Sequence, residues 1–148
     1  MLPDPAPLVE FLAPYPPEVQ ALTLAARLFL VERYGPVVEV FWDATQAVCS
    51  ALTYTGKDRD TFVNLAVYSN HVTLIFPWGV DLDDPECRLK GGGTRVRNVR
   101  LVEGMATLQD PCVLGLIDQA CARAPRPAEP PEPSAIVKVM NGPKRRPQ

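Results

Sequence analysis

The sequence TFVNLAVYSNHVTLIFPWGVDLDDPECRLKGGGTRVRNVRL, from Thr61 to Leu101, indicates how this chain folds. Its first part alternates apolar and mixed residues on both sides of the short turn Ser69-Asn70, and this pattern is typical of a β-hairpin. An acidic turn and a glycine-rich turn follow the hairpin, and residues 96–102 then predict a further strand. The stretch therefore predicts an antiparallel sheet.

The segment before the hairpin predicts one helix and one strand. Pro17 is a preferred first-turn residue and Glu18 complements the helix dipole, so a helix is expected from there until Tyr34-Gly35-Pro36 ends it. Residues 37–42 are mostly β-branched or aromatic and predict a strand. The pattern of residues 44–53 fits a short helix and an extended segment equally well.

Two helical segments are predicted after the hairpin. Leu82 to Leu89 fits one helical turn, with Asp83 or Asp84 as its cap and Pro85 near its first position. A last helix is expected to begin at Thr107, which is a fair N-cap, and to present an apolar face. Helices on both sides of the strands predict an α+β fold, in which an antiparallel β-sheet packs against N- and C-terminal helices as a single two-layer domain.

Proline divides the chain into three parts. Six of the 17 prolines lie within the first 17 residues, and seven lie from Pro125 to the C-terminus. Because proline lacks an amide donor and interrupts helices, we expect residues 1–15 to form a Pro-rich N-terminal segment and residues 16–124 to form the folded domain. Residues 125–148 predict a disordered basic tail, although its apolar patch Ala135–Met140 could dock on the domain or on a partner.

The composition excludes several classes of protein. From Arg126 onward the tail has five basic and two acidic residues, a charge of +3. Because the net charge of the chain is −2, the other residues carry about −5. A mildly acidic body does not predict a nucleic-acid-binding protein, which needs clustered Lys and Arg. No apolar run of about 18 residues predicts a membrane helix, and the N-terminus lacks the features of a signal peptide. The four cysteines have no CxxC spacing and predict free thiols in a reducing cytoplasm. We expect a small-molecule or protein partner, no nucleic acid, no membrane, and a monomer or homodimer.

Five pieces of the sequence resemble the YdhG-like domain, a bacterial domain of unknown function. They are VVEVFWDATQAV, the hairpin DTFVNLAVYSNHVTLIF, the Gly79 turn with LDDPE, the turn RLKGGG, and RVRNVRL. In that family the glycine turn usually continues to a lysine and then to an Arg-His pair, where this chain has Thr94 and Arg97-Asn98. The family is linked by fold and annotation to frataxin-like proteins, so the resemblance implies an iron-chaperone role as one candidate function.

Asp81, Asp83, Asp84 and Glu86 place four carboxylates within six residues, on a turn after a strand. Hard cations such as Fe²⁺, Mg²⁺ and Ca²⁺ prefer clustered oxygen ligands, so these residues form a candidate metal site. The same run also suits a helix start, because acidic side chains there satisfy free backbone donors. Apart from iron at this site, no cofactor is predicted.

A second candidate site combines glycines, arginines and tryptophans. The turn Gly91–Gly93 offers backbone N–H groups that could cradle an anion, with Arg95 and Arg97 close by. Trp42 and Trp78 each stand beside a turn, where an aromatic face could line a cleft. The alternatives are a flexible turn whose glycines supply positive φ, and aromatic residues that belong to the core. The expected ligand-binding residues are Trp42, Trp78, Gly91, Gly93, Arg95 and Arg97.

These features predict a non-enzymatic binding module for a small anionic or planar ligand, held in a cleft between the sheet and the glycine turn. Two alternatives stay open, a frataxin-like iron-binding protein that uses the acidic turn and a protein-interaction adaptor that uses the hairpin or the tail. An enzyme is not predicted, because the only histidine, His71, has no Ser or Cys neighbour in sequence that would form a nucleophile–base pair.

Overall fold

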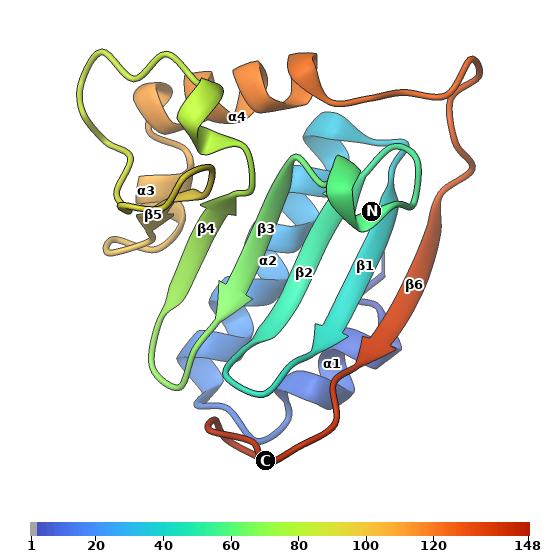
Figure 1. The fold of residues 1–148 in the computed structure, drawn as a ribbon. Helices are drawn as coiled ribbons and strands as arrows, with labels where there is room; N and C mark the ends of the chain where they lie inside the picture. The colour runs from blue at the N-terminus through green and yellow to red at the C-terminus, as the bar shows by residue number, and fades with distance from the viewer. Residues whose placement is uncertain (1–2) are drawn as a thin grey trace.

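A computed structural model describes residues 3–148 and contains a six-stranded sheet in the order β5-β4-β3-β2-β1-β6 (Figure 1). The strands are β1 (Val38–Asp43), β2 (Val48–Thr53), β3 (Val63–Val67), β4 (Val72–Phe76), β5 (Arg97–Arg100) and β6 (Ser134–Val139). Strands β1 to β5 form an antiparallel meander, and β6 pairs with β1 in parallel. The predicted antiparallel sheet is therefore a mixed sheet, because the C-terminal segment joins its edge.

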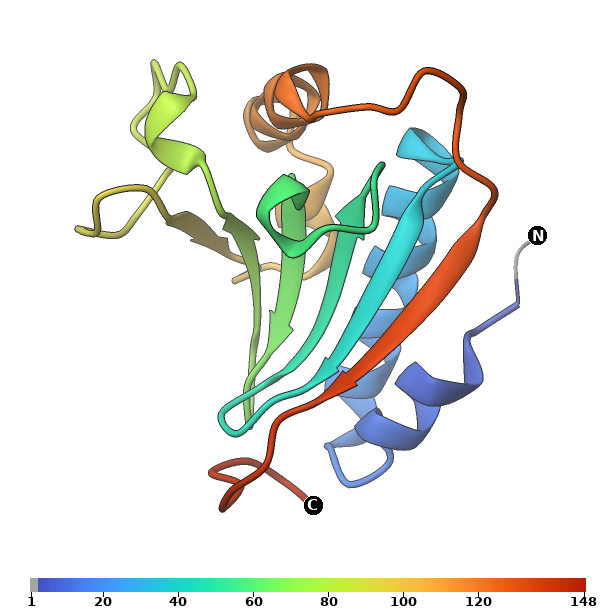
Figure 2. The same cartoon turned by 45° about the vertical axis from the view of Figure 1, so that its right-hand side comes forward.

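The helices confirm the α+β fold that the sequence predicted. They are α1 (Ala6–Leu12), α2 (Pro17–Tyr34), α3 (Met105–Leu108) and α4 (Pro111–Arg123), with the short 3₁₀ helices η1 (Asp58–Asp60) and η2 (Gly79–Asp81). Figures 1 and 2 show α1 and α2 against one face of the sheet, and α4 at the end of the sheet where β4 finishes. Among residues 3–148, no helix combines the length and apolarity that crossing a bilayer requires.

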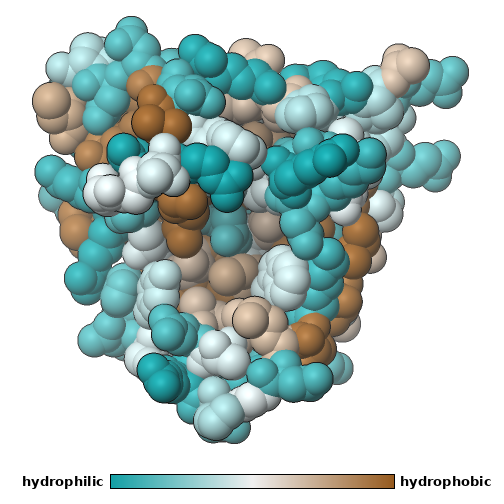
Figure 3. All heavy atoms as spheres, in the orientation of Figure 1, coloured by the Kyte–Doolittle hydropathy of each residue, from teal (hydrophilic) through white to brown (hydrophobic). Residues whose placement is uncertain are grey.

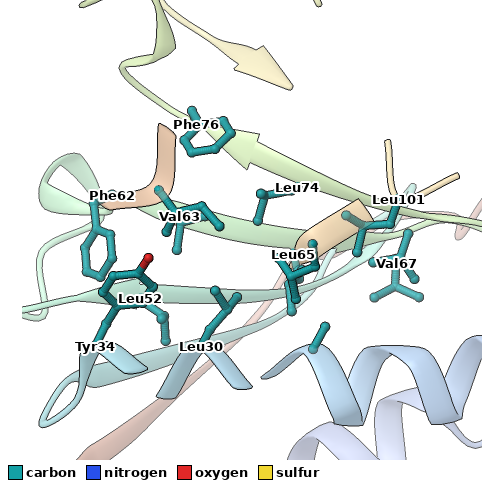
Figure 4. Packing of buried hydrophobic residues seen from close by; sticks show 14 of the residues in the cluster. Leu30, Tyr34, Leu52, Phe62, Val63, Leu65, Val67, Leu74, Phe76 and Leu101 are labelled. Atoms are coloured by element: carbon teal, nitrogen blue, oxygen red, sulfur yellow. The ribbon is translucent and has the colours of Figure 1, made fainter. Parts of the chain in front are cut away.

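The main core lies between the sheet and the helices. Strand side chains alternate between the two faces, and those of β2, β3 and β4 that point toward α2 are buried together with residues of the helices (Figure 4). The largest of these buried side chains include Leu30, Phe41, Leu52, Leu65, Leu74, Phe76 and Ile117. Arg27 of α2 is also buried and donates two hydrogen bonds of 2.7 Å to the carboxylate of Glu39 in β1. This paired charge fixes the position of α2 on the sheet.

The opposite face of the sheet is also apolar at its centre. Paired residues share a face, so one row across four neighbouring strands contains Val40, Ala51, Asn64 and Ile75. Val40 is fully buried although it points away from α2. Figure 3 shows apolar side chains gathered in the middle of this face with hydrophilic residues around them.

Two local predictions were wrong, because side chains satisfy the backbone in other ways. Residues 82–89 form no helix: the carboxylate of Asp84 accepts the N–H groups of Arg88 and Leu89 at 2.9 Å, and Cys87 has a φ of +53°, which a right-handed helix does not permit. The N-cap of α4 is Asp110, whose carboxylate accepts from the Cys112 N–H at 2.9 Å. The predicted N-cap, Thr107, belongs to the separate short helix α3.

Both terminal segments belong to the folded domain, and for the tail this agrees with the alternative that its apolar patch docks on the domain. In the N-terminal segment, Leu8 and Leu12 of α1 are fully buried, so this helix is part of the core. In the tail, the apolar patch forms β6 instead of a disordered chain, because β1 offers it a free edge. The basic end of the tail also docks, since Lys144 and Arg146 both contact the carboxylate of Asp43.

Candidate functional site

A cleft of about 460 Å³ opens at the end of the sheet where β4 finishes. Three parts of the chain line it: the loop with η1, the segment from the end of β4 through η2, and the last turn of α4. Its apolar lining consists of Phe62, Phe76, Trp78, Leu82, Ala120, Ala124 and Pro125, and its charged lining of Arg59, Asp60, Asp81 and Arg123. We call this cleft the Trp78 pocket.

Buried aromatic residues form a rigid floor for the Trp78 pocket. Phe76 is fully buried, and the ring of Phe62 stacks on Tyr54 with 5.1 Å between centroids (Figure 4 shows Phe62 and Phe76). The hydroxyl of Tyr54 donates to the backbone carbonyl of Tyr34 at 2.7 Å. Burial, followed by the neighbouring Cys121 thiol, raises the pKa of Tyr54, so this hydroxyl keeps its proton as a donor. The floor is thus held in place by both packing and a hydrogen bond.

Trp78 forms one wall of the pocket and is fixed from two sides. Its indole N–H donates to the backbone carbonyl of Arg59 at 3.1 Å. The guanidinium carbon of Arg95 lies 4.4 Å from the centre of a Trp78 ring, close enough for a cation–π interaction. Nevertheless 42% of Trp78 is exposed, which is unusual for so large an apolar side chain. The indole therefore has a fixed position and accessible surface.

The lining of the Trp78 pocket contains two arginines and two carboxylates, and Arg95 adds a third cation beside it. Arg59 and Arg123 are exposed lining residues, and Arg95 sits on the Trp78 ring. Of the two lining carboxylates, Asp60 accepts a 2.6 Å hydrogen bond from the hydroxyl of Thr55, and its other oxygen lies 4.0 Å from Nε of Arg59. The rim of the pocket therefore favours a ligand with an anionic group.

Trp42, which the sequence analysis placed in the same cleft, lies elsewhere. Trp42 pairs with Cys49, which pairs with Ala66, which pairs with Thr73, so these residues form one row across the sheet. Trp78 follows the far end of β4, beyond Phe76. The two tryptophans therefore occupy opposite ends of the strands, and one small ligand cannot contact both.

The glycine turn and Arg97 serve the structure of the chain. The guanidinium of Arg97 donates to the carbonyls of Gly93 at 2.6 Å and Val96 at 2.8 Å, so it holds the turn closed. Gly91 has a φ of +116°, which favours glycine. These contacts match the turn alternative for the glycines, and they direct Arg97 toward the backbone.

The four residues of the acidic turn, Asp81, Asp83, Asp84 and Glu86, have different neighbours in the structure. Asp84 caps backbone N–H groups, Glu86 contacts the thiol of Cys112, and the backbone of Asp83 exchanges two hydrogen bonds with the side chain of Gln119. Asp81 instead lines the Trp78 pocket. Within residues 3–148, no three His, Cys, Asp or Glu side chains are grouped so that they could hold a metal ion.

Two charged residues of the pocket, Arg59 and Arg123, were missed by the sequence analysis. Arg59 belongs to a polar turn and Arg123 to the end of a helix, where charged residues are common and carry no specific signal. Only the packing of α4 across the end of the sheet places them around one cleft.

The geometry of the Trp78 pocket suits a planar molecule that stacks on an indole and presents an anion to guanidinium groups. Comparisons of the chain with protein-family models, with curated proteins and with solved structures found no match.

Proposed function

We propose that this chain is a YdhG-like domain that binds a small planar molecule with an anionic group in the Trp78 pocket. The observation that carries the proposal is the state of Trp78, which is fixed by Arg95 and by the Arg59 carbonyl yet 42% exposed beside a cleft. An indole held in this way loses little freedom when a ring stacks on it, so the site is organised before the ligand arrives.

The two kinds of lining residue contribute different parts of the binding free energy. The aromatic and aliphatic floor removes apolar ligand surface from water, at about 25 cal/mol for each Å². Arg59 and Arg123 orient the anionic group, because a guanidinium can donate two parallel hydrogen bonds to one carboxylate. For a ligand of naphthoate size we expect a dissociation constant on the order of 50 µM.

Binding without catalysis is the reading that the lining residues support. All of them lie in the described part of the chain, and they include no histidine, cysteine, serine or lysine. The one hydroxyl, on Thr61, belongs to a buried residue. The acid–base groups of the lining are the carboxylates of Asp60 and Asp81, and Asp60 is engaged by the hydroxyl of Thr55 and by Arg59.

The test is isothermal titration calorimetry with naphthoate and, as a matched neutral probe, naphthylmethanol. Naphthoate should bind and the alcohol should bind about tenfold more weakly or not at all, because only the carboxylate engages the arginines. Arg123→Gln and Trp78→Leu should each weaken naphthoate binding. Arg33→Gln is the control, since Arg33 pairs with Asp118 outside the pocket. Equal affinity for both probes, or equal loss in the Arg33 variant, would contradict the proposal.

A further inference from the structure

The two edges of the sheet are protected very differently. Beyond β5, the backbone of Lys90 forms a bridge to Asn98, with N–H to carbonyl distances of 2.8 and 2.9 Å in the two directions. The flanking strand residues Arg97 and Arg100 add charge to that edge. Beyond β6, within residues 3–148, no strand is paired. The β6 edge therefore leaves a row of backbone donors and acceptors available to another strand.

The side chains of β6 also lack the usual protection against edge pairing. Ser134–Val139 contains no proline, and its single charged residue, Lys138, already forms an ion pair within the chain. The Lys138 ammonium lies 2.7 Å from the Asp58 carboxylate and 5.1 Å from the centre of a Trp42 ring. Val137 and Val139 are 46% and 60% exposed. In Figure 3, apolar side chains lie along the border where Figure 1 places β6.

We infer that the β6 edge binds a second copy of this chain, with the two β6 strands antiparallel and the two-fold axis passing through Val137. In an antiparallel pair, opposite residues point to the same face, so the register must pair residues of the same parity. With the axis through Val137, this residue faces Val137 of the second copy, Ala135 faces Val139, and Ile136 faces Lys138. The two six-stranded sheets join into one continuous sheet.

Self-complementarity is the reason for choosing a second copy over a foreign strand. A two-fold interface brings the same residues together from both sides, and it fails when like charges face each other. Here the only charged residue of β6 faces Ile136, and its ammonium is already neutralised by Asp58 of its own chain. On the side of the helices, the opposed residues are alanine and valine alone. The strand is thus compatible with itself at each position of this register.

The first test is the mass of the full chain in solution, by sedimentation equilibrium over a range of concentrations. We expect a reversible dimer of twice 16.3 kDa. Val137→Lys places two ammonium groups opposite each other and should raise the dimer dissociation constant by about 100-fold or more. Val102→Lys is the matched control, because Val102 is exposed near the opposite edge, and it should leave the dimer intact. Val139→Lys is the second variant if Val137→Lys does not fold.

The register is tested by cross-linking with copper phenanthroline as oxidant, which takes two electrons and two protons from a thiol pair as the S–S bond forms. Val137→Cys should link two chains, because position 137 faces itself across the axis. Ala135→Cys should link no more than the unmodified chain, because position 135 faces position 139. The inference would be overturned by a monomer at all concentrations or by a dimer that Val137→Lys and Val139→Lys leave unaffected. Equal linking of the two cysteine variants would also overturn it.

Discussion

Trp42 and Trp78 each stand beside a turn, and each has a cation above its ring, but it is Trp78 that lines the cleft of about 460 Å³. The cation is Arg95 at 4.4 Å for Trp78 and Lys138 at 5.1 Å for Trp42. The difference lies in what the rest of the chain adds. At the Trp78 end, η2 and the last turn of α4 surround a cleft. At the Trp42 end, β6 and the tail cover the strands.

The charges show the same contrast between the two ends. At the Trp42 end the cations of the tail have carboxylates within the chain: Lys138 pairs with Asp58, and Lys144 and Arg146 share Asp43. At the Trp78 end, Arg59 lies 4.0 Å from the carboxylate of Asp60 but its side chain is 76% exposed, and Arg123 is exposed on the rim of the cleft. The tail cations therefore form partly buried ion pairs, whereas the arginines of the cleft stay accessible to a ligand.

The largest effect on the free energy of unfolding is expected when residues 134–148 are deleted, so that the chain ends at Pro133. This deletion removes β6, so β1 becomes the edge of the sheet and Asp43 loses both of its cations. We expect the free energy of unfolding to fall by about 4 kcal/mol, measured by urea denaturation. An unchanged midpoint would contradict the structural role of the tail. Naphthoate binding should persist under conditions where the shortened chain stays folded, because no residue of β6 lines the Trp78 pocket.

The contrast between the two ends also explains how far the sequence could be interpreted. The hairpin, α2 and β1 were predictable because their signals are local: alternation, a first-turn proline and a run of β-branched residues. The pairing of Val40 with Ile136 was not, because an apolar patch in a Pro-rich tail does not reveal which edge it joins. Likewise, Trp42 and Trp78 have similar neighbours in sequence, and only the register of the sheet separates them.

Asp43→Asn should produce the next largest effect. The Arg146 side chain is only 5% exposed where it meets Asp43, so loss of the carboxylate leaves a buried cation without its partner. We expect the free energy of unfolding to fall by about 2 kcal/mol. Asp58→Asn is the matched control at the exposed pair with Lys138, and it should cost about 0.5 kcal/mol or less. Equal losses in the two variants would show that the tail cations contribute no more than a surface pair.

Gly79→Ala should disturb the Trp78 end alone. A Cβ at Gly79 would lie 2.5 Å from the Cβ of Arg97, so the segment that carries Trp78 must shift. We expect a loss of about 2 kcal/mol in urea denaturation, together with weaker naphthoate binding. Gly92→Ala is the control, because no atom lies within 4 Å of a Cβ there, and it should leave both quantities nearly unchanged. If the Gly92 variant alone lost binding, the glycine turn would be the anion cradle after all.

The smallest effect concerns His71, which lies in the β3–β4 turn at the Trp42 end of the sheet. Burial, followed by the charge of Arg100, lowers the pKa of His71 below its ordinary value of 6.5. At a pH near 6.5 the unfolded chain therefore binds more protons than the folded chain, so the free energy of unfolding is highest above this pH and falls as the pH drops below it. His71→Gln should reduce the pH dependence of the free energy of unfolding between about pH 7.5 and 5.5.

Naphthoate affinity should stay constant over the same range, because guanidinium groups are charged and the carboxylate of the probe is ionised throughout it. An affinity that followed His71 would mean that the two ends of the sheet are coupled.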